Sequence, residues 1–172
     1  MEVLQGRPTD ETGRLEKEIA VYDLLDKLDI PFRRVDHVHA DTMEMCQEID
    51  QALGQDICKN LFLCNRQKTQ FYLLCMMPDK PFHTKDLSAQ INSSRLSFGG
   101  AEDMERLLNL TPGSVTVLGL MYDPDCQVTL LIDNSAHIFP TMEESEVAVT
   151  RRYYRSGESE YYINRQSVRL KD

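Results

Sequence analysis

The sequence has no long apolar run and few basic residues, and both absences restrict the class of protein it can encode. No segment approaches the roughly 18 consecutive apolar residues of a membrane-spanning helix. Residues 1–7 lack the basic flank and apolar centre of a signal peptide. Asp and Glu (28) outnumber Lys and Arg (19), for a formal net charge of −9, which argues against a broad nucleic-acid-coating surface. We therefore expect a cytoplasmic protein with no membrane or DNA partner.

The cysteines show no close metal-ligand pairing, and the chain has no internal repeat. The chain has five cysteines, an odd number, and most of them lie in apolar stretches of the sequence. They are Cys46, Cys58, Cys64, Cys75 and Cys126. We expect reduced, buried thiols rather than disulfides or a redox centre. The sequence predicts neither a metal ion nor an organic cofactor.

The order of helical and strand patterns predicts an α+β fold with a mixed, mostly antiparallel sheet and flanking helices. Two apolar runs separated by a polar segment indicate a hairpin, with Lys59 and Asn60 at its rim. The helices are expected at 15–28, from Asp41 or Thr42 to about Leu53, at 83–91 and at 101–109, and the strands at 32–37, 61–64, 70–77, 94–98, 115–121 and 128–132.

The character of the sequence changes after about Ile132. Segments 146–154 and 160–164 flank a turn-like stretch and are rich in charge and tyrosine, a pattern typical of a β-hairpin. We therefore predict a domain over residues 1–132 and a C-terminal hairpin appendage over 133–172.

Lys59 opens an apolar strand, where its charge must either reach water or meet an anion such as a nucleic-acid phosphate. A solvated lysine at a strand end is the alternative interpretation. Several other landmarks occur along the chain in this order: Leu25 to Pro31, His37 with Thr42, Lys59-Asn60-Leu61-Phe62-Leu63, Leu96-Ser97-Phe98 before Ala101-Glu102, and Pro112-Gly113-Ser114-Val115 with Leu118-Gly119-Leu120.

These landmarks resemble the free-standing prolyl-tRNA editing proteins, which are related to the editing insertion of bacterial prolyl-tRNA synthetase and to the YbaK proteins. The resemblance implies hydrolysis of the ester that joins a mischarged amino acid, alanine above all, to tRNA for proline. It implies two partners: the 3′ end of an aminoacyl-tRNA, and prolyl-tRNA synthetase. The pocket would discriminate by size, since a small cavity admits alanine and excludes proline.

The resemblance also assigns residue roles. Lys59 would hold the phosphate or ribose of the terminal adenosine and Asn60 would position water or the aminoacyl group, while amides at Gly113 and Ser114 would stabilise the negative oxygen. Substrate binding would fall to His37, Thr42, Ser97 and Phe98. A helix cap at Thr42, a structural role for His37 and an ordinary Pro-Gly turn remain alternatives.

Two departures from the family pattern leave a second interpretation open. Related proteins carry a later His-Pro segment, and this chain has none, because His137 is followed by Ile138. Val117 or its neighbour stands where many relatives have proline. The alternative to a deacylase is therefore a catalytically weakened module of the same fold that binds tRNA or the synthetase.

The tail resembles a second family. Residues 133–135, 146–164 and 168–172 are similar to a segment from the ATPase head of the structural maintenance of chromosomes proteins. That ATPase cannot operate here, because the chain has no G-x-x-x-x-G-K-[ST] phosphate loop. A natural fusion, a gene-prediction error and an engineered join are all compatible with this arrangement, and a chromosome-associated fragment is a third functional hypothesis.

Overall fold

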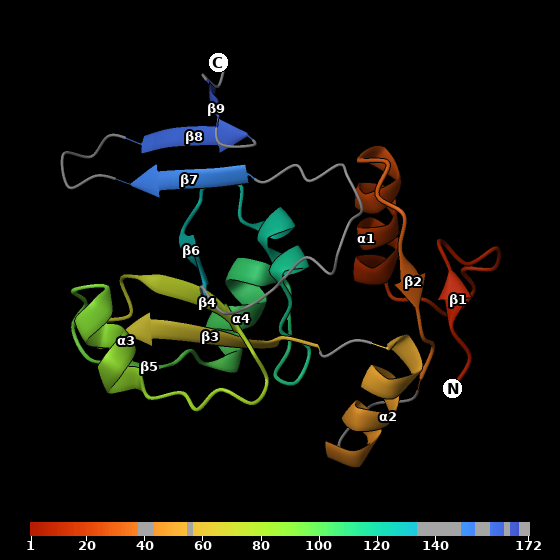
Figure 1. Cartoon of the computed structure of the whole chain (residues 1–172), viewed down its shortest axis with the longest axis horizontal. Coiled ribbons are helices and arrows are strands. Elements are labelled where there is room, and N and C mark those ends of the chain that lie inside the picture. Colours follow the sequence, from red (N-terminus) through yellow and green to blue (C-terminus); the bar gives the residue numbers. More distant parts are fainter. Residues whose placement is uncertain (38–42, 55–56, 134–148, 154–158, 164–165, 169–172) are drawn as a thin grey trace. The chain divides into compact units, whose positions relative to one another are not determined.

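The computed structural model describes residues 1–37, 43–54, 57–133, 149–153, 159–163 and 166–168. The chain divides into two compact units, residues 1–136 and residues 137–172. Figure 1 shows the helices and strands of both units along the chain. The larger unit contains every described residue of the predicted site.

The N-terminal segment forms a short ribbon joined to a helix. Strand β1 (Leu4–Gln5) pairs antiparallel with β2 (Arg33–Arg34), and α1 (Glu16–Lys27) lies between them in sequence. Tyr22, buried on α1, stacks on Phe32 with ring centroids 5.8 Å apart. The predicted helix over 15–28 is confirmed, whereas the strand expected over 32–37 shrinks to two residues.

Helix α2 (Met43–Leu53) occupies the region where the second helix was expected. Gly54 follows its last residue with a φ of +67°. A left-handed residue after the last turn is a common helix terminus, and glycine adopts that conformation without a Cβ penalty.

The main sheet has the strand order β5-β3-β4-β6. Strand β3 pairs antiparallel with both β4 and β5, and β4 pairs parallel with β6. The strands are β3 (Lys59–Asn65), β4 (Phe71–Met76), β5 (Leu96–Phe98) and β6 (Val128–Ile132). The predicted hairpin and the mixed, mostly antiparallel sheet are confirmed.

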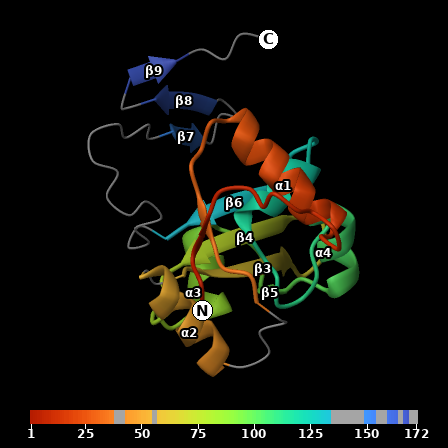
Figure 2. The same cartoon turned by 90° about the vertical axis from the view of Figure 1, so that its right-hand side faces the viewer.

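The two faces of this sheet bury separate apolar clusters, because successive strand residues point to opposite sides. The face covered by α4 (Ala101–Leu108) includes Phe62, Cys64, Phe71, Leu73 and Val128. The face next to α3 (Thr84–Gln90) includes Leu63, Tyr72, Leu74, Met76 and Leu96. Figure 2 shows the sheet with these two helices on its opposite sides. We call these the α4 face and the α3 face.

The strand predicted over 115–121 is wrong. Residues Val117–Tyr122 form a 3₁₀ helix, η1. The Thr116 hydroxyl accepts a hydrogen bond from the Leu118 amide at 3.3 Å, which caps the first turn. Gly119 is buried so closely that an added Cβ would lie 2.5 Å from Leu110 Cδ1. The apolar residues therefore pack through a tight helical turn rather than by pairing in the sheet.

The smaller unit is a three-stranded antiparallel sheet. Strand β7 (Val149–Tyr153) pairs with β8 (Ser159–Ile163), and β8 pairs with β9 (Gln166–Val168). The predicted hairpin corresponds to β7 and β8, and β9 adds a strand that the sequence pattern did not indicate.

Candidate functional site

Lys59 and Asn60 begin β3, with β4 on one side of the strand. Lys59 lies opposite Met76, a member of the α3-face cluster, and Asn60 lies opposite Cys75. Because directly paired residues share a face, the two side chains project to opposite faces of the sheet. They flank one end of the strand rather than lining one wall.

The Lys59 ammonium group is held by the loop that follows β4. Its Nζ donates to the carbonyl oxygen of Pro78 at 3.3 Å and to that of Lys80. The side chain is half-buried, so the methylene stem packs while the charge reaches the protein surface. An ammonium group has three hydrogens, so these carbonyls leave one for a ligand.

Asn60 connects β3 with the glycine turn. Its Nδ2 donates to the Val115 carbonyl oxygen at 3.1 Å, a contact between residues 55 positions apart in the chain. Val115 in turn packs against the apolar cluster of the α4 face. The structure therefore brings Asn60 and the segment containing Gly113 and Ser114 together at one end of β3.

The Thr111–Ser114 segment is a tight turn with Pro112 at its second position and Gly113, φ +85°, at its third, the pattern of a type II turn. The Ser114 amide donates to the Thr111 carbonyl at 3.0 Å, and the Ser114 hydroxyl donates to that same oxygen at 2.9 Å. The Ser114 amide is thus already engaged, so in this conformation it does not point at an oxyanion. Gly113 is exposed, and nothing lies within 4 Å of where its Cβ would be.

Ser97 and Phe98 lie on β5, farther along the same sheet. Ser97 is opposite Cys64 on the α4 face, with its hydroxyl 3.6 Å from the Cys64 sulfur. Phe98 is opposite Leu63 on the α3 face. Its ring makes an edge contact with the ring of Phe82, and the two ring centroids are 6.1 Å apart. The side chains of these two predicted binding residues therefore project to opposite faces of the sheet.

The structure describes one of the two predicted binding residues of the N-terminal region, His37, but not the other, Thr42. His37 is exposed and lies three residues beyond β2. Thr42 lies outside the described residues, so its predicted role has no structural counterpart here.

The cysteines near the site are thiols, and one is unsuited to nucleophilic attack. Cys75, opposite Asn60, is buried, and burial with a smaller contribution from Cys58 raises its pKa to about 11. A thiol with that pKa stays protonated at neutral pH. Cys64 is buried too, but Cys126 is exposed, which corrects the expectation for that residue. Among the residues that the structure describes, no group of three or more His, Cys, Asp or Glu could hold a metal ion.

Sequence reasoning missed the main-chain partners of the site. The carbonyls of Val115, Pro78 and Lys80 hold Asn60 and Lys59, and backbone oxygens carry no side-chain signature. The division of Lys59 and Asn60 between two faces could have been found, because neighbouring residues in a strand alternate.

The sheet with a helix on each face and the lysine-asparagine pair at one strand end define a mixed α+β domain, whose fold is shared with solved structures. The crystal structure of hypothetical protein APE2540 superposes with a TM-score of 0.52 at 18% identity, covering 69% of this chain and 73% of that one. A designed epitope-scaffold structure gives a TM-score of 0.53 at 17% identity, covering 69% and 72%. No described helix has the length and apolar character needed to cross a membrane.

The family is shown by sequence. Residues 37–142 match the model of the aminoacyl-tRNA editing domain. The prolyl-tRNA editing protein ProX of Acetoanaerobium sticklandii is 31% identical over 121 residues, which cover 70% of this chain and 74% of the relative. The chain therefore belongs to the aminoacyl-tRNA editing domain family.

A second likeness covers a shorter stretch. A segment of 46 residues, 27% of this chain, is 59% identical to the chromosome partition protein Smc of Desulfitobacterium hafniense and of Bacillus subtilis. It spans 4% of each of those proteins. The resemblance of the tail to chromosome-segregation proteins is thus confirmed as a local match.

Proposed function

We propose that this chain hydrolyses mischarged aminoacyl-tRNA in the cytoplasm, with alanyl-tRNA for proline as its substrate and prolyl-tRNA synthetase as its partner. The observation that carries the proposal is the Asn60–Val115 hydrogen bond, which ties the start of β3 to the glycine turn inside the matched region. The related ProX protein, named as a prolyl-tRNA editing protein, supports the choice of substrate class.

The opposed faces of Lys59 and Asn60 suggest how the substrate lies. The terminal nucleotide would straddle the end of β3, with its phosphate at the Lys59 ammonium on the α3 face and its ester at Asn60 on the α4 face. Lys59 would act as a point charge and Asn60 as an oriented amide.

The reaction is ester hydrolysis. Water adds to the ester carbonyl carbon, negative charge develops on the carbonyl oxygen, and the bond to the ribose oxygen breaks as that oxygen gains a proton. The products are the amino acid and a tRNA with its terminal hydroxyl restored. Donors fixed near the carbonyl oxygen lower the barrier because they interact most strongly with the developing charge. Asn60 and the exposed Gly113 turn are the groups available for this.

The catalytically weakened binding module is the second candidate, and a specific contact favours it. The Ser114 amide, one of the two expected oxyanion donors, is bound to the Thr111 carbonyl. A module of this kind would hold the aminoacyl end without accelerating its hydrolysis.

Two substitutions separate the candidates. Lys59→Ala and Asn60→Ala are compared with Lys27→Ala, an exposed lysine in the last turn of α1. For an enzyme, Asn60→Ala should lower the single-turnover rate by roughly a hundredfold to a thousandfold, while Lys59→Ala weakens both binding and rate. For a binder, no variant changes ester loss from the buffer rate and only affinity falls. Rates that exceed the buffer rate and are equal for wild type, Lys59→Ala and Asn60→Ala would contradict the assigned site.

The domain organisation is part of the proposal. Residues 1–132 would form the editing domain and residues 133–172 an appendage without ATPase function, close to the division into two compact units. The proposed site residues all lie in the first part.

A further inference from the structure

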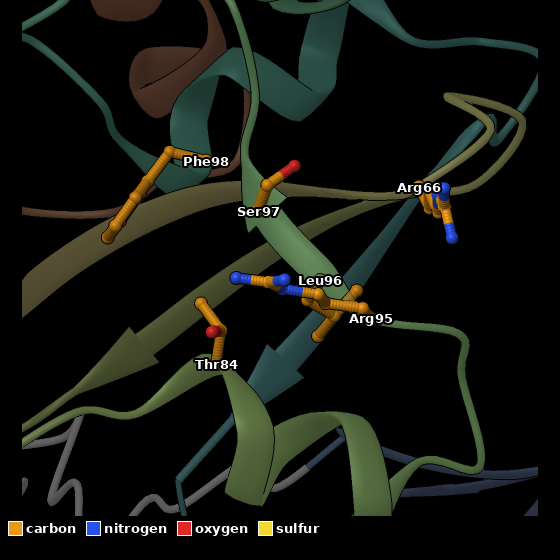
Figure 3. A pocket seen from close by; sticks show the side chains of 6 residues that line it. All are labelled: Arg66, Thr84, Arg95, Leu96, Ser97 and Phe98. Atoms are coloured by element: carbon orange, nitrogen blue, oxygen red, sulfur yellow. The ribbon is translucent and has the colours of Figure 1, made fainter.

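A pocket of about 610 Å³ opens beside the edge strand β5, near the end of β3 remote from Lys59. Figure 3 shows the side chains that line it. They are Arg66, Thr84, Arg95, Leu96, Ser97 and Phe98. Of these, only Ser97 and Phe98 were among the residues predicted to bind substrate.

Two hydrogen-bonded links hold the walls of this pocket. Ser88, buried in α3, donates from Oγ to the Thr84 carbonyl at 2.6 Å and accepts from the Leu96 amide at 3.0 Å. Ser94 Oγ donates to Gln67 Oε1 at 3.1 Å, which joins the segment before β5 to the β3–β4 loop. The three segments that carry the lining residues are therefore tied together.

The loop that carries Arg66 is itself braced. Asn65 is 6% exposed, and its Oδ1 accepts from the Thr69 and Gln70 amides at 2.9 and 3.1 Å. Its Nδ2 donates to the Thr69 hydroxyl at 2.9 Å. Arg66 thus extends from an ordered turn.

The charge at the pocket is uncompensated. In the part of the chain that the structure describes, Arg7, Arg14, Arg34 and Arg106 each form an ion pair with a carboxylate, whereas neither Arg66 nor Arg95 forms one. Arg33 on β2 forms no ion pair within the described residues either, but Arg66 and Arg95 line one pocket. Guanidinium groups match the oxygens of phosphates.

An aromatic surface adjoins these charges. Phe98 is 63% exposed, the highest value among the exposed large hydrophobic side chains described. Its edge contact with Phe82 supports the ring while leaving most of it accessible. In Figure 3 Arg95 extends toward Thr84, and the Ser97 hydroxyl points away from both. A basic groove beside an accessible ring is the combination with which proteins bind single-stranded nucleic acid.

The geometry points to a docking site for the single-stranded 3′ end of the RNA, with phosphates at Arg66 and Arg95 and a base stacked on Phe98. This inference rests on the proposed function. Phe98 lies opposite Leu63, four residues from Lys59 along β3, a distance of about 13 Å on the same face. The strand would run from the β3–β4 loop past Phe98 toward Lys59, where its last nucleotide reaches the proposed site.

The test measures binding of a fluorescein-labelled single-stranded RNA ending in CCA to the full chain, over a range of salt concentrations. The double variant Arg66→Gln/Arg95→Gln is compared with Arg33→Gln, an exposed arginine on β2. Each phosphate contact to a single strand contributes about 0.7 to the slope of log affinity against log salt. We expect the double variant to lower this slope by about 1.4 and Arg33→Gln to leave it unchanged.

Phe98→Leu keeps an apolar side chain but removes the ring. It should weaken binding about tenfold without changing the salt slope, because stacking releases no counterions. Melting temperatures identify any variant that fails to fold. A double variant that is folded and binds with the affinity and slope of Arg33→Gln overturns the inference.

Failure of this inference and failure of the proposed function have different signatures. If wild type removes the amino acid from alanyl-tRNA and the double variant has an unchanged KM, the docking site is wrong and the deacylase stands. If wild type does not accelerate ester loss but RNA binding depends on Arg66 and Arg95, the docking site stands and the deacylase is wrong.

Discussion

At the scale of single residues, most polar groups of the candidate site already form hydrogen bonds within the protein. Lys59 is anchored by two carbonyls, Asn60 by one, and the Ser114 amide by the Thr111 carbonyl. Gly113 differs from them in having a positive φ and open space around it. Its contribution to the site therefore depends on this conformation, which leaves the main chain of the turn open to a ligand.

Gly113→Ala tests this role. Alanine at a φ of +85° is strained without colliding with any atom, so we expect a loss of about 1 kcal/mol in unfolding free energy. The deacylation rate should fall further than stability alone explains, because the turn beside Asn60 shifts. Gly13→Ala, with a φ of +81° and equally open surroundings, is the matched control away from the site. Equal activity in both variants would show that the turn geometry is not used.

At the scale of elements, the sequence predicted the parts of the fold that simple periodicity determines. Two runs of apolar residues predicted the β3–β4 hairpin, and apolar residues three or four positions apart predicted α1 and α4. These predictions succeed because each element buries a regular apolar stripe or face. The segment 115–121 shows the limit of this reasoning. Its valines and leucines fit a strand equally well, and only the packing of Gly119 on Leu110 and the Thr116 cap favour the 3₁₀ helix.

The contacts around the candidate site show the same limit. The assignment of Lys59 and Asn60 to the site stays a prediction, and it rests on their place before an apolar run, which is local information. The Asn60–Val115 contact joins residues 55 positions apart, and its acceptor is a main-chain oxygen. No local pattern specifies such a partner.

The β3–β4 loop provides a prediction at this scale. Asn65→Ala removes a buried amide that serves two backbone donors and one hydroxyl, so the Thr69 and Gln70 amides lose their side-chain acceptor. We expect the unfolding free energy to fall by roughly 1–3 kcal/mol, measured by denaturant titration. Gln51→Ala, at an exposed residue of helix α2, is the comparison. A variant as stable as wild type would mean that the loop does not depend on Asn65.

The N-terminal ribbon should be sensitive to acid. Hydrogen bonds from Arg14 and Arg34 hold the pKa of Asp36 well below its usual range. A carboxylate whose pKa is lower in the folded than in the unfolded protein stabilises the fold at pH values above its unfolded-state pKa, which is about 3.9 for Asp. This stabilisation is lost as the pH falls toward the folded-state pKa. Asp36→Asn should therefore melt below wild type at pH 7 and approach it at pH 2. A constant difference between the two proteins across that range would contradict the assignment.

At the scale of the whole molecule, an acidic chain combines an editing domain with a short segment similar to chromosome partition proteins. With a net charge of −9, recognition of nucleic acid would fall to local groups, and Lys59, Arg66 and Arg95 are the cations that we propose for it. Affinity for tRNA should accordingly be modest and specific to its single-stranded end.

The most direct measurement is single-turnover ester loss from alanyl-tRNA for proline, followed with the intact chain in excess and with buffer alone. The account predicts faster ester loss with the protein than with buffer, and a rate that returns toward the buffer value when Lys59 is replaced by alanine. Ester loss no faster than in buffer, with a protein that is folded by its melting curve, would contradict it.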